Sequence, residues 1–416
     1  MAFMTIPKIR IEEYSYNLPS ERIAKYPLTK RDLSKLLIYN KGVIEENIFS
    51  SIHSYIPKKS LMVFNNTKVV PARLFFKKET GAIIEIFCLE PYSPSDYPLS
   101  FACESECSWK VIIGNVKKWK GGLLSLYLHD SANQSLKDIN LRAELLEKQD
   151  NSFIVKFVWD GGLPFSKVLE MCGQIPIPPY LNRETEGIDL ERYQTLYAKF
   201  RGSVAAPTAG LHFTEEVLSK IKEQNIDCEE VCLHVGAGTF LPVKSEFISD
   251  HLMHAELFTV TKEFLNKLYS ALDSDGEVKV VSVGTTSTRT LESLYYAGVQ
   301  CHNVGPDNWS PLLVNQWEPY ENDNTLSPKD SIKSLLEYLD CNSLINLTLR
   351  TQIIIVPSYK FKIVDILITN FHQPQSTLLL LISAFIGGDG WKDIYQYALS
   401  HDFRFLSYGD SSILIR

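Results

Sequence analysis

The sequence lacks the loop signatures of several common cofactor and hydrolase sites. It has no GxGxxG loop after a predicted strand, so a dinucleotide-binding loop is not expected. A GxxxxGK[ST] loop and a GxSxG elbow are also missing, which argues against a Walker-type nucleotide site and a Ser-His-Asp hydrolase. The eight cysteines form no CxxC pair, so we expect free thiols in a reducing compartment and no structural zinc.

Long apolar runs and a positive net charge are missing as well. The longest apolar run, at 378–386, is interrupted by Ser383 and is too short to span a bilayer. The first residues lack the apolar stretch of a secretory signal. The net charge of −7 argues against non-specific coating of nucleic acid but leaves room for a local basic patch. We therefore expect a cytoplasmic protein without a membrane partner.

The length of the chain and the change in residue pattern along it predict two domains. At 416 residues it exceeds the size at which one hydrophobic core stops growing. Residues 67–159 contain short β-branched and aromatic runs between turns, which is typical of a small barrel or sandwich. Helix and strand patterns alternate after residue 160. Residues 302–350 are polar, and we predict a surface excursion there with one helix near 332–339.

Reactive residue types gather in loops beside apolar runs in four separated stretches. A core needs no such groups at the ends of its elements, whereas a binding site does, because rigid scaffolds present functional groups on loops. We expect the four stretches to close into one cleft. They are SVAAPTAGLHFT (203–214), LHVGAGTF (233–240), VVSVGTTSTRTLES (280–293) and ILITNFHQPQSTLLL (366–380).

The third stretch places Gly284 and a run of hydroxyl residues between a strand and a helix. Backbone amides at a helix N-terminus attract anions, and hydroxyls add donors for a carboxylate or a phosphate. A simple helix cap would use only one hydroxyl. We predict that Thr285, Thr286 and Ser287 bind a ligand and that Arg289 adds a bidentate contact.

Titratable groups in the other stretches are candidates for proton transfer. His212 and His234 lie in Gly-containing loops, and an imidazole with a pKa near ~6.5 exchanges protons at cytoplasmic pH. Asp365 lies inside an apolar strand, where a buried carboxylate needs a partner or its pKa rises. It is either an orienting partner or a general base. The exit of that strand carries Asn370, Phe371 and His372.

HLMHAE (251–256) suggests a metal site at first sight. Two histidines three residues apart and a following Glu256 could share one helical face. The motif is not HExxH, however, and spacing identifies no distant third ligand. We predict no metal there, although a hydrolase using His251 and His254 remains an alternative. His254 or Glu256 could contact a substrate instead.

Ten stretches, taken in order, resemble the S-adenosylmethionine:tRNA ribosyltransferase-isomerase family of queuosine biosynthesis. The resemblance runs from about Tyr14 to Asp410. The stretches are SYNLPSERIAKYPL (15–28), LMVFNNTKVVPARL (61–74), IPIPPYLNR (175–183), ERYQTLYA (191–198), GSVAAPTAGLHFT (202–214), LHVGAGTFLPV (233–243), HLMHAE, VGTTSTRTLES (283–293), the segment 356–385, and FRFLSYGD (403–410).

The resemblance implies an enzyme that transfers and isomerises the ribosyl group of S-adenosylmethionine. The acceptor is 7-aminomethyl-7-deazaguanine at the tRNA wobble position, and the products are epoxyqueuosine-tRNA, adenine and methionine. The implied fold is mixed α/β (α+β): a large α/β catalytic domain of residues 1–66 and 160–416, and an inserted small antiparallel β-barrel domain of residues 67–159. S-adenosylmethionine is a co-substrate, and no other cofactor, metal or protein partner is expected.

The reaction assigns tasks to the candidate residues. The acceptor amine must lose a proton, the ribose carbon beside the sulfonium must lose another, and the departing adenine needs a proton or a hydrogen bond. The candidates for these transfers are His212, His234, Asp365 and His372. The candidates for binding the methionine carboxylate or a phosphate are Thr285, Thr286, Ser287 and Arg289. Asn370 and Phe371 could position and stack a purine.

The anticodon stem-loop of tRNA is the expected RNA partner, and its target base must leave the stack to react. The first 42 residues carry eight Lys or Arg and four Asp or Glu. Candidate phosphate contacts on the predicted barrel are Lys110, Lys117, Lys118 and Lys120. Ser358, Gln373 and Gln375 stand where the family commonly has Gly, Leu and Lys. A paralogue with a different deazaguanine acceptor and a catalytically silent RNA-binding relative therefore remain alternatives.

Overall fold

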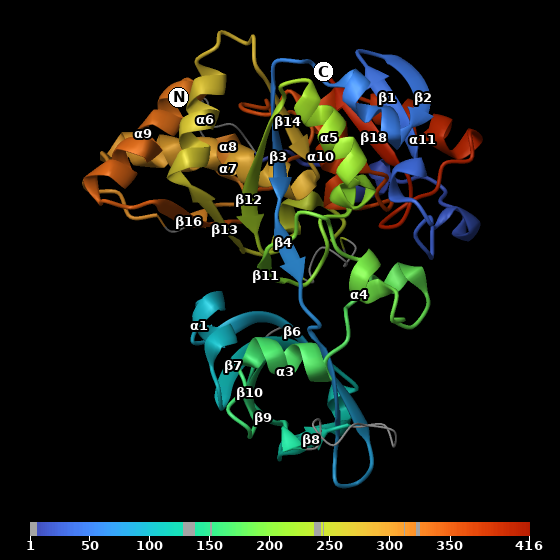
Figure 1. Cartoon of the computed structure of the whole chain (residues 1–416), viewed down its shortest axis with the longest axis vertical. Helices are drawn as coiled ribbons and strands as arrows, with labels where there is room; N and C mark the ends of the chain where they lie inside the picture. The colour runs from blue at the N-terminus through green and yellow to red at the C-terminus, as the bar shows by residue number, and fades with distance from the viewer. Residues whose placement is uncertain are drawn as a thin grey trace.

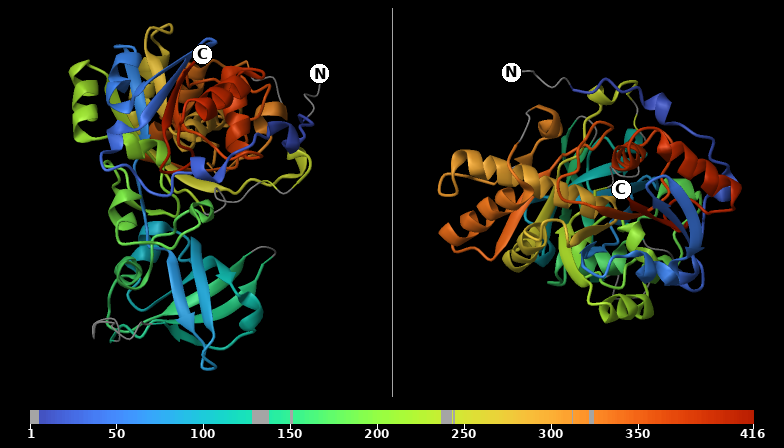
Figure 2. Two further views of the ribbon diagram at one scale, coloured as in Figure 1. Left: turned by 90° about the vertical axis from the view of Figure 1, so that its right-hand side faces the viewer. Right: turned by 90° about the horizontal axis from the view of Figure 1, so that it is seen from above.

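The computed structural model describes residues 6–127, 138–149, 152–236, 243, 245–311, 313–321 and 325–416. It contains a large domain built on one broad sheet and a small barrel joined to one edge of it (Figure 1). Figure 2 shows the C-terminus at the end of the large domain away from the barrel. Within the described parts of the chain, every helix is too short or too polar to cross a membrane.

The large sheet is mixed, with a parallel centre. Strands β12, β3, β14 and β17 are neighbours and run parallel, with Val281 of β14 opposite Met62 of β3 and Ile366 of β17. In sheet order the strands are β15 (Leu313–Val314), β16 (Asn346–Thr351), β13 (Glu256–Thr261), β12 (Asp227–Leu233), β3 (Ser60–Asn65), β14 (Lys279–Val283), β17 (Ile366–Asn370), β18 (Ser411–Ile415), β1 (Lys35–Asn40) and β2 (Val43–Ile48).

Alternating side chains give each face of this sheet its own core. In β3, Leu61 and Val63 pack into one cluster, whereas Met62 and Phe64 pack into the other. Successive side chains of a strand point to opposite faces, so an uninterrupted apolar run has to be covered on both sides. The first cluster lies under the helices α6 (Lys262–Leu272), α7 (Thr285–Val304), α9 (Pro328–Cys341), α10 (Thr377–Ile386) and α11 (Gly390–Ser400).

The second cluster lies on the opposite face of the sheet, which fewer helical elements cover. These elements are α5 (Glu215–Glu223) and the 3₁₀ segments η4 (Phe49–Tyr55) and η7 (Thr208–His212). Thr214 caps α5, because its hydroxyl accepts the Val217 N–H at 3.3 Å. The short α8 (Glu318–Glu321) and α4 (Asp189–Arg192) complete the α-helices of the large domain within the described residues. All eight cysteines are free, as predicted.

The helix predicted near residues 332–339 is confirmed as part of α9, but the surface excursion predicted for residues 302–350 was wrong, because part of this segment packs into the large domain. Ile332, Leu335 and Leu339 of α9 are fully buried, and β16 pairs antiparallel with β13. α7 and α9 also pack closely, because a Cβ built on Gly298 would lie 2.2 Å from the Ser331 carbonyl oxygen. The apolar stripe of α9 recurs at helical spacing, but the polar residues before it dominate the composition of the segment.

The small domain is a closed antiparallel barrel, as the fold prediction required. Its strands, in order around the barrel, are β10 (Phe153–Val158), β7 (Glu106–Gly114), β6 (Ile83–Ser93), β5 (Arg73–Lys77), β8 (Leu124–Leu126) and β9 (Arg142–Lys148). The helices α1 (Tyr97–Ala102) and α3 (Phe165–Cys172) pack on it. Although we placed the end of the insert at residue 159, Phe165 of α3 belongs to the barrel core, so this packing unit continues through α3.

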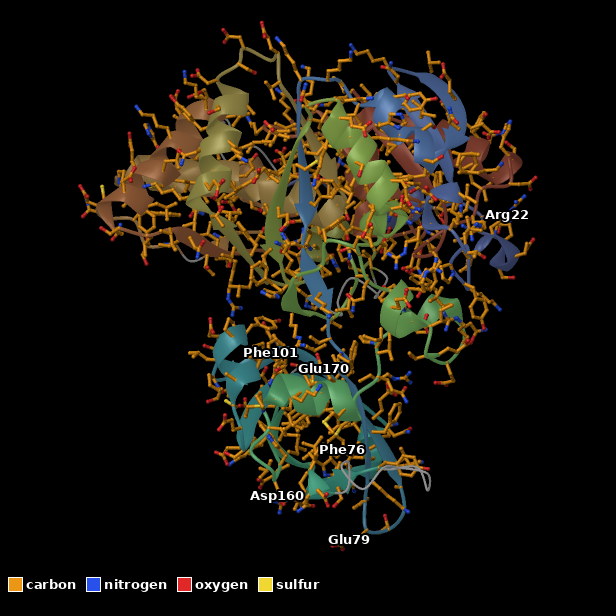
Figure 3. The ribbon with its side chains drawn as sticks, in the orientation of Figure 1. Arg22, Phe76, Glu79, Phe101, Asp160 and Glu170 are labelled. Carbon is orange, nitrogen blue, oxygen red and sulfur yellow. The ribbon has the colours of Figure 1, made fainter. Side chains whose placement is uncertain are left out.

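The barrel is joined to the sheet at the carboxyl end of β3. There β4 (Thr67–Val69) pairs with β11 (Phe200–Ser203), and the chain enters and leaves the barrel beside this pair (Figure 1). Glu170 of α3 faces the large domain and forms an ion pair with Arg201 of β11 (Figure 3). The barrel therefore lies next to the edge at which the parallel strands end.

Candidate active site at the carboxyl ends of the parallel strands

The four predicted stretches meet because neighbouring parallel strands end at one edge of the sheet. The carboxyl ends of β12, β14 and β17 lead directly into three of them, and β11, beside the end of β3, leads into the fourth. Ligands of open α/β sheets bind at this edge. A cavity of about 770 Å³ opens there, lined by residues of all four stretches: 205–209, Val235, 284–286, 369–373 and Ser376.

Several polar atoms of the cavity wall have no partner in the protein. The Tyr193 hydroxyl, the Thr286 hydroxyl and the Asn370 amide oxygen are buried and accept or donate no hydrogen bond within the described residues. Leaving a buried polar atom unpaired costs about 1–3 kcal/mol, so such atoms are rare in a finished core. Their convergence on one cavity indicates a ligand with complementary polar groups.

The hydroxyl run after Gly284 divides between the cavity and the interior. Thr285 and Thr286 line the cavity at the N-terminus of α7. Ser287 is fully buried, and its hydroxyl donates to the Val283 carbonyl at 2.9 Å. A helix turns by about 100° per residue, so consecutive residues cannot all face one cavity. The ligand site predicted from this run therefore contains the two threonines and not Ser287.

Arg289 lies behind the cavity and is already paired. Its guanidinium forms an ion pair with Glu256, and its Nε donates to the Ile353 carbonyl at 3.2 Å. The other Glu256 oxygen accepts the Gly236 N–H at 3.1 Å. Neither side chain lines the cavity, so the pair connects α7 to β13 and to the loop after β12.

His372 lines the cavity and is held on three sides. Its Nε2 lies 3.0 Å from the Thr369 hydroxyl, and its backbone N–H donates to the Tyr395 hydroxyl at 3.0 Å. The Tyr16 hydroxyl donates to its carbonyl. Burial lowers the pKa of His372 to about 3. The imidazole is therefore neutral at physiological pH and has a fixed orientation.

His212 is separated from the large cavity by Ser407. It lines a smaller neighbouring cavity of about 290 Å³, and Ser407 lines both cavities. Its Nδ1 is 2.8 Å from the Ser34 hydroxyl, while its buried Nε2 lacks a hydrogen-bond partner among the described side chains and backbone. Burial lowers the pKa of His212 to about 4, although the neighbouring Asn370 side chain raises it.

His234 and Asp365 lie outside both cavities. The His234 ring stacks on Tyr97 of the barrel domain, with ring centroids 4.2 Å apart, and burial lowers its pKa to about 4. Asp365 precedes β17 and therefore lies at the opposite end of this strand from Asn370. Its side chain is 33% exposed, contrary to the expected burial, and accepts the Val280 N–H at 2.9 Å.

The predicted groups Phe371 and Asn370 differ in how far their side chains are free to contact a ligand. Phe371 lines the cavity, but its ring already packs against Tyr395, Phe403 and Phe405. Asn370 donates to the Leu406 carbonyl at 3.0 Å and keeps its amide oxygen unpaired.

The helical face expected for HLMHAE is absent, since its first five residues are irregular and Glu256 begins β13. His254 is exposed there, and the described residues contain no group of three or more potential metal ligands.

The four predicted RNA-binding lysines lie on the barrel. Lys117, Lys118 and Lys120 are exposed beside η5 (Val116–Lys118). Lys110 forms an ion pair with Glu90 at 3.0 Å, and Glu90 also lies 3.7 Å from Arg350 of β16. None of the four lines either cavity.

Four cavity residues were not predicted from the sequence. The large cavity is also lined by Tyr180, Tyr193, Leu406 and Ser407, from segments far from the four stretches. Each lies in a motif that carried the family resemblance, at 175–183, 191–198 and 403–410. Membership of these motifs was the only indication in the sequence that the residues could be functional. Neither the spacing nor the hydrophobic pattern of the segments indicates that they reach the edge of the sheet.

Comparisons with known proteins bear directly on the predicted family. A family model described as queuosine biosynthesis protein matches residues 11–414. A protein of Trichlorobacter lovleyi named S-adenosylmethionine:tRNA ribosyltransferase-isomerase is 38% identical over 407 residues, covering 97% of this chain and 99% of that protein. One of the same name from Halothermothrix orenii is 37% identical over 411 residues, covering 98% and 100%.

A crystal structure of S-adenosylmethionine tRNA ribosyltransferase from Thermotoga maritima is 27% identical, with a TM-score of 0.46, and covers 97% of this chain and 100% of that one. The resemblance seen in the sequence is confirmed by the family model and the two full-length relatives. The chain belongs to the family of queuosine biosynthesis proteins whose relatives are named S-adenosylmethionine:tRNA ribosyltransferase-isomerase.

Proposed function

We propose that the chain transfers and isomerises the ribosyl moiety of S-adenosylmethionine onto 7-aminomethyl-7-deazaguanine at the wobble position of tRNA. The products are epoxyqueuosine-tRNA, adenine and methionine. The observation that carries this proposal is the full-length match to the named relatives, joined to a cavity built from the stretches predicted to form the site. Its lining combines aromatic side chains with hydroxyl and amide groups, as a site for a nucleoside-like ligand requires.

The methionine carboxylate of the substrate binds at the N-terminus of α7. A helix of this length presents free N–H groups and a partial positive charge at its first turn. Thr285 and Thr286 lie there, and the Thr286 hydroxyl has no other partner within the described residues. We assign the carboxylate to this turn and not to Arg289, which does not line the cavity and whose guanidinium is held by Glu256.

The purine-like rings bind among the aromatic and amide groups of the wall. Tyr180 and Tyr193 line the cavity, and stacking of a base on an aromatic ring contributes roughly 1–3 kcal/mol. The unpaired oxygen of Asn370 accepts a hydrogen bond from an exocyclic amine. Phe371 shapes the wall from the core side, because its ring already packs against other rings.

The proton transfers at the ligand fall to His372, which lines the large cavity, whereas His212 lines the neighbouring cavity beyond Ser407. Burial holds the pKa of each well below its ordinary value, so both are neutral bases at physiological pH. A neutral base accepts the proton of the acceptor amine or of the ribose carbon beside the sulfonium, and the resulting imidazolium donates it to adenine as the glycosidic bond breaks. We assign His234 to positioning the barrel rather than to proton transfer, because its ring is stacked on Tyr97.

The tRNA reaches this edge of the sheet beside the barrel. Lys117, Lys118 and Lys120 are exposed on the barrel, at its end away from the large domain, and supply phosphate contacts remote from the cavity. S-adenosylmethionine serves as co-substrate with no further cofactor, and the enzyme works in the cytoplasm, where its RNA substrate is found.

The test is incubation of the protein with ribose-labelled S-adenosylmethionine and tRNA carrying the aminomethyl-deazaguanine. We expect release of adenine in equal amount to label entering the tRNA. A matched reaction with tRNA carrying ordinary guanine at the wobble position should release neither. Retention of tRNA without adenine release would instead favour the catalytically silent relative, and turnover only with another deazaguanine would favour the paralogue.

A further inference from the structure

Three arginines line the smaller cavity beside His212. Arg31 belongs to η3 (Arg31–Leu33), Arg192 ends α4, and Arg404 precedes β18. The cavity is a shallow hollow open to solvent, and all three side chains are partly exposed. An anion in solution can therefore reach the guanidinium groups.

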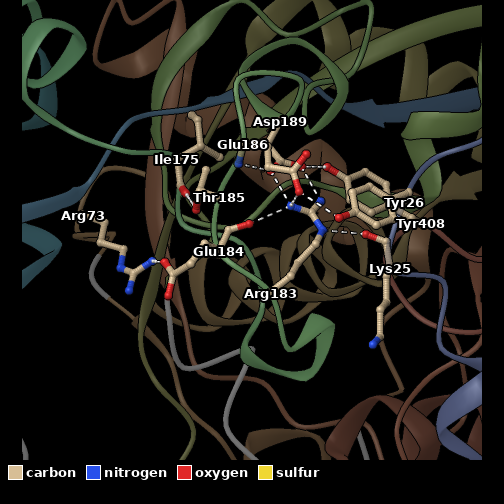
Figure 4. Close-up of polar contacts among 10 residues, drawn as sticks. All are labelled: Lys25, Tyr26, Arg73, Ile175, Arg183, Glu184, Thr185, Glu186, Asp189 and Tyr408. Atoms are coloured by element: carbon tan, nitrogen blue, oxygen red, sulfur yellow. Dashed lines mark hydrogen bonds and ion pairs between the residues drawn. The ribbon is translucent and has the colours of Figure 1, made fainter.

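The positive charge of this cavity is only partly balanced by carboxylates among the described residues. Arg404 pairs with Asp410 at 3.3 Å, but Arg31 and Arg192 form no ion pair with any described carboxylate. A buried carboxylate nearby, Asp189, accepts two hydrogen bonds from Arg183, at 2.7 and 2.8 Å, and is not free to neutralise them (Figure 4).

Hydrogen-bond donors are left over as well. Arg31 and Arg192 each donate to two backbone carbonyls and so hold the loop 28–31 against 191–194. A guanidinium has five N–H groups, so the contacts with backbone carbonyls use only some of the donors of each arginine. The Nε of Arg192 is buried and lacks a hydrogen-bond partner among the described residues, and the buried Nε2 of His212 has only the neighbouring Asn370 side chain, without close hydrogen-bond geometry. A purely structural role in holding these two segments together would not require so much positive charge, and it leaves the Nε donor of Arg192 without a partner in the described part of the chain.

We propose that this cavity binds a backbone phosphate of the RNA substrate, next to the nucleotide whose base enters the large cavity. The inference rests on the function proposed above. Ser407 forms part of both walls, so the two cavities are neighbours, as the base and the phosphate of one nucleotide must be. Arg31 and Arg192 bind the phosphate oxygens with planar, bidentate geometry, which favours phosphate recognition by arginine.

The assignment to RNA rather than to the methionine carboxylate follows from the large cavity. That carboxylate already has a site at the first turn of α7, where the Thr286 hydroxyl is unpaired. Burial and the neighbouring charge of Arg192 lower the pKa of Arg31, and the nearby charge of Glu191 opposes them, which agrees with two guanidinium groups that lie close together. A phosphate between them would relieve this repulsion.

The first experiment needs no variant and therefore no assumption about folding. Binding of the full-length protein to anticodon stem-loops is measured by direct titration, with one phosphate at a time replaced by neutral methylphosphonate. We expect a loss of at least about tenfold for one of the two phosphates that flank the target nucleotide. Equal affinity for both of these modified RNAs and the unmodified one overturns the proposal.

The second experiment pairs this RNA with the variants Arg192→Gln and Arg192→Lys. Arg192→Gln should weaken binding of the unmodified stem-loop by at least about tenfold, lower the salt slope of log Kd by up to about 0.7, and cancel the methylphosphonate effect. Arg192→Lys keeps the charge and should recover part of the affinity. Lys30→Gln is the matched control, because Lys30 is exposed and lines neither cavity.

The outcomes separate this inference from the proposed function. If the Kd of S-adenosylmethionine rises in Arg192→Gln while RNA binding is unchanged, the cavity serves the methionine carboxylate and the phosphate proposal fails. Independent effects of the variant and the methylphosphonate also overturn it. If the unmodified enzyme binds RNA in this manner but releases no adenine, the proposed reaction fails and the phosphate site stands.

Discussion

Replacement of Thr286 by valine separates binding from folding in the proposed carboxylate site. Valine has nearly the same shape as threonine but no hydroxyl. In the ligand-free protein the Thr286 hydroxyl is buried and has no hydrogen-bond partner among the described residues. Its removal therefore breaks no contact within the protein, and it relieves the cost of burying an unpaired polar atom.

The expected magnitudes follow from that difference. A hydrogen bond to a charged group contributes about 1.5–3 kcal/mol, which corresponds to a roughly 10- to 150-fold rise in the Kd of S-adenosylmethionine. The free energy of unfolding should stay the same or rise by about 1 kcal/mol. Calorimetric titration with S-adenosylmethionine measures the first quantity, and urea unfolding without ligand measures the second.

Thr288→Val is the matched control two residues along the same helix. The Thr288 hydroxyl is fully buried away from the cavity, lies 2.9 Å from the Ser282 hydroxyl and donates to the Gly284 carbonyl at 3.2 Å. Its loss should lower the free energy of unfolding by about 1 kcal/mol and leave the Kd unchanged within about twofold. The reasoning is refuted if Thr286→Val destabilises the protein as much as Thr288→Val does, or if it leaves the Kd unaltered.

Three further predictions concern stability. Burial lowers the pKa of His212, His234 and His372 to about 4, 4 and 3, below their ordinary value of ~6.5. The unfolded chain thus binds protons that the folded chain does not, so urea unfolding at pH 7, 6 and 5 should show stability falling on acidification, by up to about 4 kcal/mol per pH unit. Glu292→Gln should lower the free energy of unfolding by about 3 kcal/mol or more in the same assay, because the buried carboxylate accepts four hydrogen bonds that an amide cannot all replace. Gly202→Ala should lower the melting temperature, because its φ is +138° and the new Cβ would lie 2.5 Å from the His234 ring; an unchanged melting temperature would contradict that geometry.

Much of the fold could be predicted from local pattern. Residues 366–369 are apolar enough to require cover on both faces, and they form a central parallel strand, β17. Gly284 and the threonines after it indicate a strand ending in a helix N-terminus, where α7 begins. By contrast, the helix α9 was predicted but its burial was not, because composition averages over a segment while burial depends on one helical stripe.

The candidate site was predicted only as a set of stretches. Asp365 and Asn370 are close in sequence, yet they lie at opposite ends of β17, and only one of these ends faces the cavity. Arg289 was assigned to a ligand because its partner Glu256 is distant in sequence. Partners of this kind cannot be inferred from spacing, since they depend on which elements are packed together.

The amino-acid sequence by itself determined the family, the two-domain organisation and the loops that carry the chemistry, because motifs, apolar periodicity and turn residues are local properties. Only the tertiary structure decided which side chains share a cavity. The order and polarity of the strands bring Tyr193, Thr286 and His372 to one edge of the sheet. The same packing gathers Arg31 and Arg192 beside His212, and that juxtaposition depends on the path of the whole chain.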